Sequence, residues 1–107
     1  MKNKPRYNIV IVASEFNSSV SDALLDGATR AFNEHDGRKL DIFKVPGAFE
    51  IAAAVKLSAK ELKPDAIVTL GCVIRGETKH FDFISSECAR SIQELTLELK
   101  IPVMFGV

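Results

Sequence analysis

The sequence predicts one α/β domain, residues 1–107, built on a doubly wound parallel sheet of four strands. Two observations lead to this fold class. Short apolar runs rich in Val and Ile alternate along the chain with segments whose apolar residues recur at helical spacing. No linker or repeat divides the 107 residues, a length that suits a single domain. The resulting order β-α-β-α-β-α-β favours a parallel sheet with right-handed crossover connections.

The first half of the chain supplies two predicted strands and the helix between them. Tyr7–Ala13 is almost continuously apolar, which is typical of a strand buried on both faces. Helical spacing of apolar residues between positions 20 and 32 predicts a helix, with Ser18 or Ser19 as its N-terminal cap. Leu40–Val45 alternates more clearly between apolar and polar residues, so we expect it near an edge of the sheet.

The second half adds two helices and two strands. Phe49–Leu62 is predicted to be an Ala-rich helix ended by a Lys-Pro pair, and Asp65–Leu70 is the strand that follows. A third helix is expected after His80, with apolar positions up to Leu99. Pro102–Val107 begins a fourth strand.

Helical cover for the sheet is incomplete in this reading. Three helices are too few to cover both faces of four buried strands. Because a domain seldom ends inside an apolar strand, we expect at least one further helix after Val107, with cover by a partner subunit as the alternative.

Composition and charge exclude several classes of protein. The 14 acidic side chains balance the 14 basic ones and no basic cluster stands out, so we expect no binding to nucleic acid or to an anionic membrane. No apolar stretch is long enough to span a bilayer, and the N-terminus lacks the pattern of a signal peptide, so a cytoplasmic protein is expected. Cys72 and Cys88 lack metal-like spacing and are expected to be buried free thiols.

Three loops are predicted to meet at the carboxyl ends of the strands, where ligands bind in sheets of this kind. They carry Phe16–Asn17, Gly47–Glu50 and Cys72–His80. This edge of the sheet therefore gathers aromatic rings, a carboxylate and an imidazole, which makes it the candidate site.

The third loop is predicted to bind an anion. It leaves its strand through Gly71 and Gly76 and enters a helix near Thr78, which directs backbone N–H groups and the positive end of the helix dipole at one point. Glu77 stands where a nucleotide-binding P-loop has lysine, so we expect a single phosphate rather than a triphosphate. His80 lies beside this point and is the candidate general acid and base.

Each candidate also has a structural interpretation. Phe16 and Phe49 are compatible with ordinary core aromatics, and His80 with a surface histidine. Glu50 suits the first turn of a helix, where a carboxylate complements the dipole, and this role is compatible with ligand binding. Arg75 is expected to be structural, pairing with a carboxylate at a subunit contact.

Four motifs occur in the order and approximate spacing found in lumazine synthases. They are Phe16–Asn17, Val45–Ile51, Leu70–Gly76 with Thr78–Phe81, and Ile101–Gly106. The resemblance covers nearly the whole chain and implies a three-layer, flavodoxin-like fold. It implies an enzyme of riboflavin biosynthesis that condenses 5-amino-6-(ribitylamino)uracil with 3,4-dihydroxy-2-butanone 4-phosphate to give 6,7-dimethyl-8-ribityllumazine, phosphate and water, without cofactor or metal.

The resemblance also implies a homo-oligomer and a role for each site residue. The family forms pentamers or icosahedral shells of pentamers with active sites between subunits, and riboflavin synthase is a candidate partner. Residues implied to bind substrate are Phe16, Asn17, Ala48, Phe49, Glu50, Cys72, Val73, Ile74, Glu77, Thr78 and Phe105. Phe16 would stack on the pyrimidine, Glu77 and Thr78 would seat the phosphate, and Phe105 would reach into the adjacent subunit's site. His80 is the implied general acid and base.

Two rival functions are open at this point. One is a catalytically impaired assembly subunit or flavin-like ligand binder of the same fold, lacking the arginine that clamps the phosphate, which in the family lies after the position of Val107. The other is a flavodoxin-type electron carrier. The loop Ser14–Ser18 lacks the run of Ser, Thr and Gly that would wrap a flavin phosphate, which disfavours the second.

Overall fold

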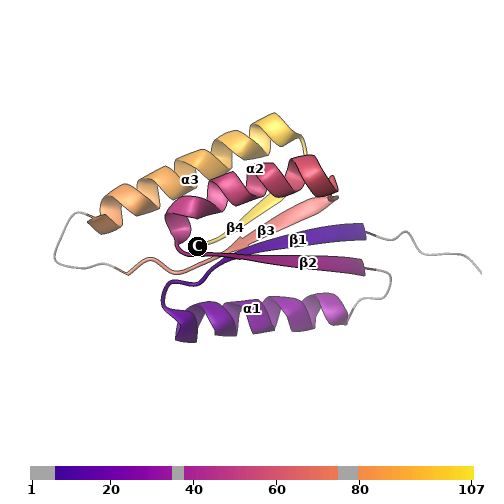
Figure 1. Ribbon diagram of the computed structural model, residues 1–107, viewed down its shortest axis with the longest axis horizontal. Coiled ribbons are helices and arrows are strands. Elements are labelled where there is room, and N and C mark those ends of the chain that lie inside the picture. Colours follow the sequence, from indigo (N-terminus) through magenta and orange to yellow (C-terminus); the bar gives the residue numbers. More distant parts are fainter. Residues whose placement is uncertain (1–6, 35–37, 75–79) are drawn as a thin grey trace, which may run out of the picture.

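The computed structural model describes residues 7–34, 38–74 and 80–107 and contains one parallel sheet (Figure 1). Its strands are β1 (Tyr7–Ser14), β2 (Arg38–Val45), β3 (Ala66–Leu70) and β4 (Val103–Gly106), in the order β2-β1-β3-β4. Its helices are α1 (Ser18–Asn33), α2 (Ile51–Leu62), α3 (His80–Leu99) and a short 3₁₀ turn, η1 (Ala48–Glu50). The predicted order and the edge position of β2 are confirmed.

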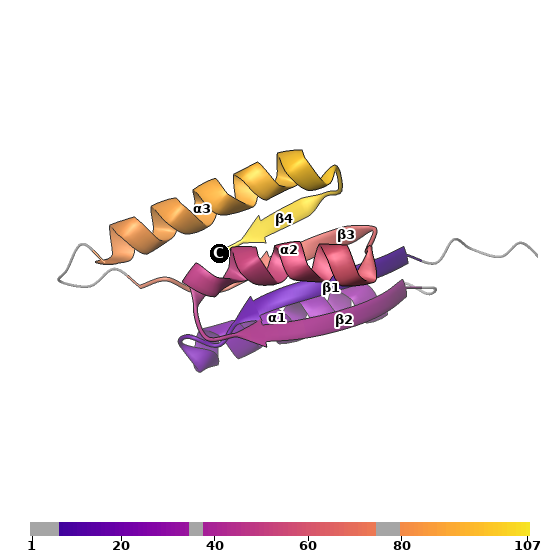
Figure 2. The ribbon, with the colours of Figure 1, turned by 45° about the horizontal axis from the view of Figure 1, so that its top comes forward.

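The helices form layers on both sides of the sheet. Figures 1 and 2 show α1 on one side and α2 with α3, side by side, on the other. All strand pairs are parallel, with Ile11 of β1 opposite Ile42 of β2 and Val68 of β3. The chain therefore has the three-layer, flavodoxin-like α/β fold that the sequence predicts.

The larger part of the core lies between the sheet and the α2–α3 layer. Val10 and Val12 of β1 are fully buried there, together with Ile51 and Val55 of α2. Ile92 of α3 packs into the same cluster. Continuous burial from Ile9 onward explains the unbroken apolar run of this strand, since alternate side chains enter opposite cores.

The core beneath α1 is smaller. Ile11, Ala13 and Leu70 are buried there, and Ala28 and Phe32 of α1 pack against them. Apolar side chains of the two edge strands stay open in the described chain, with Phe43 of β2 at 41% and Met104 of β4 at 52% exposure. The apolar sequence of β4 predicts a strand buried on both faces, but in this structure most of its side chains are exposed.

Three local predictions are wrong. The N-terminal cap of α1 is Asn17, in the left-handed conformation with φ 56°, and not a serine. Its side chain caps no backbone N–H but accepts a hydrogen bond from Ser19 Oγ at 3.2 Å. Phe49 lies in η1 rather than in the following helix. Cys72 is only partly buried, whereas Cys88 is buried as expected.

Candidate active site

A cavity of about 390 Å³ lies at the carboxyl edge of the sheet, between three strand-to-helix loops and the start of α3. Its walls are mostly apolar. The lining residues are Phe16, Pro46, Gly47, Ala48, Phe49, Glu50, Cys72, Val73, Ile74 and Ile84. This is the edge at which the sequence predicts a ligand site, because the carboxyl ends of parallel strands and the N-termini of the following helices meet there.

Phe16 is held in the loop after β1 by hydrogen bonds on both sides of its backbone. Its N–H donates to Ser14 Oγ at 3.2 Å, and its carbonyl accepts from Ser21 Oγ at 2.8 Å. Both serines are buried, while the Phe16 ring is 51% exposed. The fixed backbone therefore presents an open aromatic ring to the cavity instead of adding it to the core.

The loop after β2 turns through η1 and supplies the opposite wall. The Glu50 N–H donates to the Gly47 carbonyl at 3.1 Å, which closes the 3₁₀ turn. A Cβ at Gly47 would lie 3.3 Å from Glu50 Oε1, so the carboxylate folds back toward this glycine. Ala48 is buried in the core and anchors the turn, whereas the Phe49 ring is 55% exposed. The turn thus carries one ring and one carboxylate into the site.

Gly71 allows close packing beneath the third wall. A Cβ at this position would lie 3.2 Å from Ser14 Cβ and 3.4 Å from Ile51 Cδ1. The Gly71 N–H donates to the Gly106 carbonyl at 3.2 Å, which ties the end of β3 to β4. The loop then places Cys72 and its two successors in the cavity wall.

The start of α3 forms a further wall of the cavity. Ile84 lines it directly. Phe83 contacts the site through another ring, because its centroid lies 5.9 Å from that of Phe49 at an interplanar angle of 44°. The helix backbone begins at His80, so the positive end of its dipole points toward this edge of the sheet.

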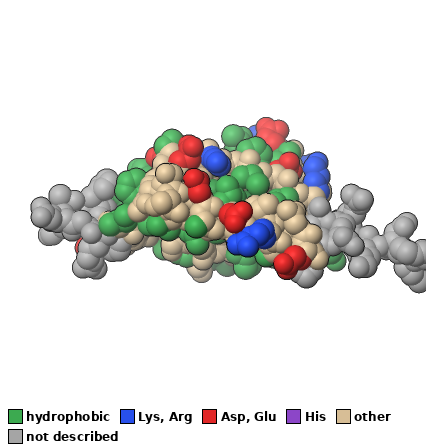
Figure 3. All heavy atoms as spheres, turned by 90° about the horizontal axis from the view of Figure 1, so that it is seen from below, with side chains coloured by type: hydrophobic (Ala, Val, Ile, Leu, Met, Phe, Trp, Pro, Cys, Tyr) green, Lys and Arg blue, Asp and Glu red, His purple; other side chains and the backbone are tan. Residues whose placement is uncertain are grey.

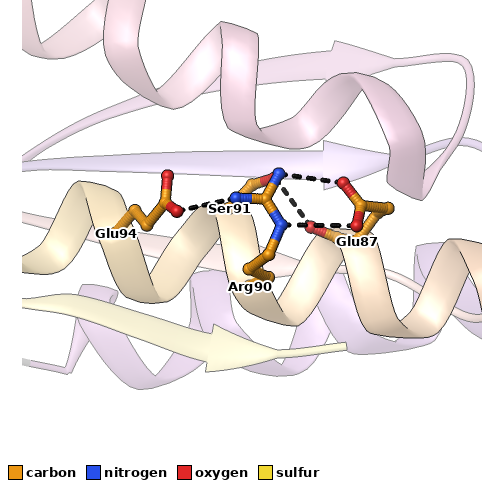
Figure 4. A network of polar contacts seen from close by, with 4 residues as sticks. All are labelled: Glu87, Arg90, Ser91 and Glu94. Carbon is orange, nitrogen blue, oxygen red and sulfur yellow. Dashed lines mark hydrogen bonds and ion pairs between the residues drawn. The ribbon is translucent and has the colours of Figure 1, made fainter.

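Farther along α3 an exposed arginine bridges two carboxylates (Figure 4). Arg90 Nη1 donates to Glu94 Oε1 at 2.7 Å, and Nη2 donates to Glu87 Oε1 at 2.9 Å. Hydrogen bonding and the charge of Arg90 hold the pKa of Glu87 below its ordinary value. Burial raises the pKa of the neighbouring Cys88 thiol. The exposed Arg90 and the buried Cys88 thus lie on the polar and apolar faces of α3.

Seven of the residues that the sequence predicts as substrate-binding lie together in the cavity: Phe16, Ala48, Phe49, Glu50, Cys72, Val73 and Ile74. Two do not line it. Asn17 is the helix cap, and Phe105 lies on β4 with 48% of its surface exposed. Glu77 and Thr78 lie outside the described residues, as does Arg75, and the description of His80 covers its backbone only.

Sequence reasoning placed Gly47 in a candidate loop but missed Pro46 and Ile84 as wall residues and Phe83 as the neighbour of Phe49. Helical spacing predicts Ile84 on the apolar face of its helix, but it does not show that this side chain also lines the cavity. Its place in the second turn, just after the candidate loop, was the available signal.

Other kinds of site find no support in the described residues. No group of three or more His, Cys, Asp or Glu side chains among them could hold a metal ion. Within the same residues, no helix is both long and apolar enough to cross a membrane. On the face seen in Figure 3, acidic and basic side chains are interspersed with hydrophobic ones instead of gathering into one basic patch. Among the described residues, the apolar cavity is therefore the candidate site.

A sequence model of one enzyme family matches almost the entire chain. The family is 6,7-dimethyl-8-ribityllumazine synthase, and the match spans residues 6–107. The chain belongs to this family. The resemblance drawn from the four motifs is thus confirmed, and the cavity residues lie within the matched part of the lumazine synthase sequence.

Proteins that carry the family name are similar to the chain over most of its length. The 6,7-dimethyl-8-ribityllumazine synthase of Thermococcus onnurineus is 44% identical over 100 residues, which cover 94% of this chain and 66% of that protein. Those of Kosmotoga olearia and Campylobacter hominis are 46% and 45% identical over 101 residues, covering 92% of this chain and 65% of each relative. The chain thus spans just under two thirds of the length of these relatives.

Proposed function

We propose that this protein forms 6,7-dimethyl-8-ribityllumazine from 5-amino-6-(ribitylamino)uracil and 3,4-dihydroxy-2-butanone 4-phosphate. The single observation that carries the proposal is the meeting of Phe16, the Ala48–Glu50 turn and the Cys72–Ile74 segment in one cavity. These residues come from three motifs far apart in the chain, and the same three motifs match the family.

The pyrimidine substrate suits the apolar part of the cavity. Its flat ring would stack on the open Phe16 side chain, and its polar edges would meet the backbone of Cys72–Ile74. The hydroxyls of the ribityl chain can donate hydrogen bonds to the Glu50 carboxylate, which accepts them. Ala48 and Phe49 would hold the carbon skeleton of the same chain.

The phosphate of the second substrate would bind where α3 begins. Support comes from the helix backbone, which starts at His80 and leaves its first N–H groups without intrahelical partners. Glu77 and Thr78 match the phosphate-binding positions of the family. Asn17 is proposed as a further substrate contact at the start of α1.

His80 is proposed as the group that moves protons. The amine of the pyrimidine attacks the ketone, and water is lost as the imine forms. Phosphate then leaves, and a second water is lost when the ring closes. Each step adds or removes protons on nitrogen or oxygen near neutral pH, for which an imidazole is suited. Alignment of two substrates in one cavity would supply much of the remaining acceleration.

Assembly completes the proposal. We infer a cytoplasmic homo-oligomer, a pentamer or an icosahedral shell of pentamers, whose active sites lie between subunits. The exposed Phe105 ring on β4 is available to enter the site of an adjacent subunit. Riboflavin synthase, which would use the lumazine product, is the proposed protein partner.

The test is turnover by the purified protein. With both substrates present, lumazine absorbance and free phosphate should rise in equal amounts, and neither should rise with one substrate alone. Native mass measurement of the same sample reports whether subunits assemble in multiples of five. Tight binding of the pyrimidine without product would contradict the enzyme proposal and favour a ligand-binding protein of the same fold.

A further inference from the structure

One contact between two aromatic rings at the candidate site lies outside the hydrophobic core. Phe49 of η1 and Phe83 of α3 lie with ring centroids 5.9 Å apart and planes tilted by 44°, a geometry that is favourable for aromatic pairs. The two rings are 55% and 57% exposed. Because more than half of each ring stays in contact with solvent, the pair removes little apolar surface from water. The pair therefore acts mainly on the orientation of the two rings and not through the burial of apolar surface.

The contact joins two elements that form different walls of the cavity. η1 carries Phe49 and Glu50, and α3 carries Ile84 and begins at His80. Phe83 does not line the cavity itself, whereas both Phe49 and Ile84 do. Phe83 therefore reaches the site through Phe49.

Without its neighbour, the Phe49 ring would have few constraints. η1 is a single 3₁₀ turn of three residues, closed by one backbone hydrogen bond. Its second residue, Phe49, is exposed and is not packed in the core. An exposed aromatic side chain normally samples more than one rotamer. A ring packed against one side of Phe49 removes part of that freedom before a ligand arrives, which lowers the entropic cost of binding.

We propose that Phe83 is a positioning residue that holds the Phe49 ring in the wall of the cavity and thereby raises the affinity of the site for the ribityl-bearing pyrimidine. The inference rests on the proposed function for the identity of the ligand. Phe83 touches no reacting atom in this scheme, so it affects substrate binding more than the chemical step.

The test measures binding and turnover of Phe83→Ala, Phe83→Leu and Phe83→Tyr. The alanine and leucine variants should raise the Kd and KM for the pyrimidine substrate by about 2- to 10-fold, the range expected when an aromatic pair is lost. The tyrosine variant keeps the ring and should stay within about twofold of the native protein. In all three, kcat at saturating substrate should change less than twofold. A fall in kcat with unchanged KM would overturn the assignment.

Leu97→Ala is the matched control. Leu97 lies on the same helix, is 73% exposed and is remote in sequence from the cavity-lining residues. Alanine favours helix at both positions, so circular dichroism should report an intact fold for Phe83→Ala and Leu97→Ala. Leu97→Ala should leave the pyrimidine KM unchanged.

A double-mutant cycle separates action through Phe49 from direct action on the ligand. In a Phe49→Ala background, Phe83→Ala should change the Kd less than twofold, because its target is gone. Multiplicative effects of the two substitutions would overturn the proposal.

The NMR signals of the Phe49 ring give a readout that needs no ligand. They should shift and broaden in Phe83→Ala but not in Leu97→Ala, and unchanged signals would contradict the positioning role. If the native protein binds no pyrimidine, the proposed function fails while the ring signals still decide whether Phe83 positions Phe49.

Discussion

The two ends of the α2–α3 layer each hold a cavity, but the chemistry of the two differs. The cavity at the carboxyl edge has about 390 Å³ and is lined by two phenylalanine rings, a thiol and one carboxylate. The cavity at the amino edge is larger, about 470 Å³, and is lined by Lys56, Lys60 and Lys63 with Glu98 and apolar side chains. Volume alone would favour the amino edge.

The direction of the helices explains the difference. α2 and α3 both begin at the carboxyl edge and end at the amino edge. Lys60 lies in the last turn of α2 and Lys63 is its C-terminal cap, so the negative end of that helix dipole complements their charge. Lys56 also pairs with Glu98 at 3.6 Å. At the carboxyl edge both helices begin, so the positive ends of their dipoles lie there, and the exposed rings of Phe16 and Phe49 line the cavity.

Substitution of the proposed acid and base should give the largest difference between the two ends. His80→Ala should slow lumazine formation by about two to four decades, the usual contribution of a general acid and base, with little change in pyrimidine affinity. Lys60→Ala at the amino edge should leave the rate within about twofold of that of the native protein, because this exposed lysine has no role in the proposed reaction. Steady-state kinetics of both variants decides. An unchanged rate in His80→Ala removes His80 from the mechanism.

The second largest effect is expected from removal of the Phe16 ring, which is proposed to stack on the pyrimidine. Phe16→Ala should weaken pyrimidine binding by about 5- to 150-fold, since stacking of a base on an aromatic side chain contributes about 1–3 kcal/mol. Isothermal titration with the pyrimidine substrate measures this. Phe43→Ala removes a ring of similar exposure, 41%, from the edge strand and serves as control. Equal losses in the two variants would show that the effect is not local to the cavity.

The two thiols offer a chemical probe of the same edge. Cys72 lines the carboxyl-edge cavity, whereas Cys88 is buried in the core with a pKa raised by burial. Iodoacetamide should therefore modify Cys72 roughly tenfold or more faster than Cys88, because alkylation needs an accessible thiolate. Bound pyrimidine should slow the labelling of Cys72 only, as peptide mass spectrometry can show. Faster labelling of Cys88 would contradict the structure of the core.

The smallest effect is expected from the ion pair at the amino edge. The side chains of Lys56 and Glu98 are 66% and 56% exposed, so Lys56→Ala should lower the free energy of unfolding by no more than about 1 kcal/mol. Urea denaturation at low and high salt measures this, and salt should erase the difference. A loss that persists at high salt would mean that the lysine contributes through packing of its methylene groups.

The fold could be read from the sequence because its local and long-range signals agree. The apolar run of β1 is explained by a central strand with helices on both sides, and the alternation of β2 by an edge strand. Departures occur where backbone geometry overrides composition. Asn17 takes the cap position that serine was expected to fill, and Phe49 lies in a 3₁₀ turn that helical spacing cannot distinguish from the start of α2.

The sequence by itself determined the fold class, the family and the edge of the sheet at which the motifs gather. It could do so because period, turn residues and motif spacing are local properties of the chain. Only the tertiary structure decided that Ile84 joins the cavity wall, that Phe83 packs on Phe49, and that Asn17 and Phe105 do not line the cavity. These facts depend on how α3 lies against η1 and the sheet, and packing between segments distant in sequence leaves no local pattern to read.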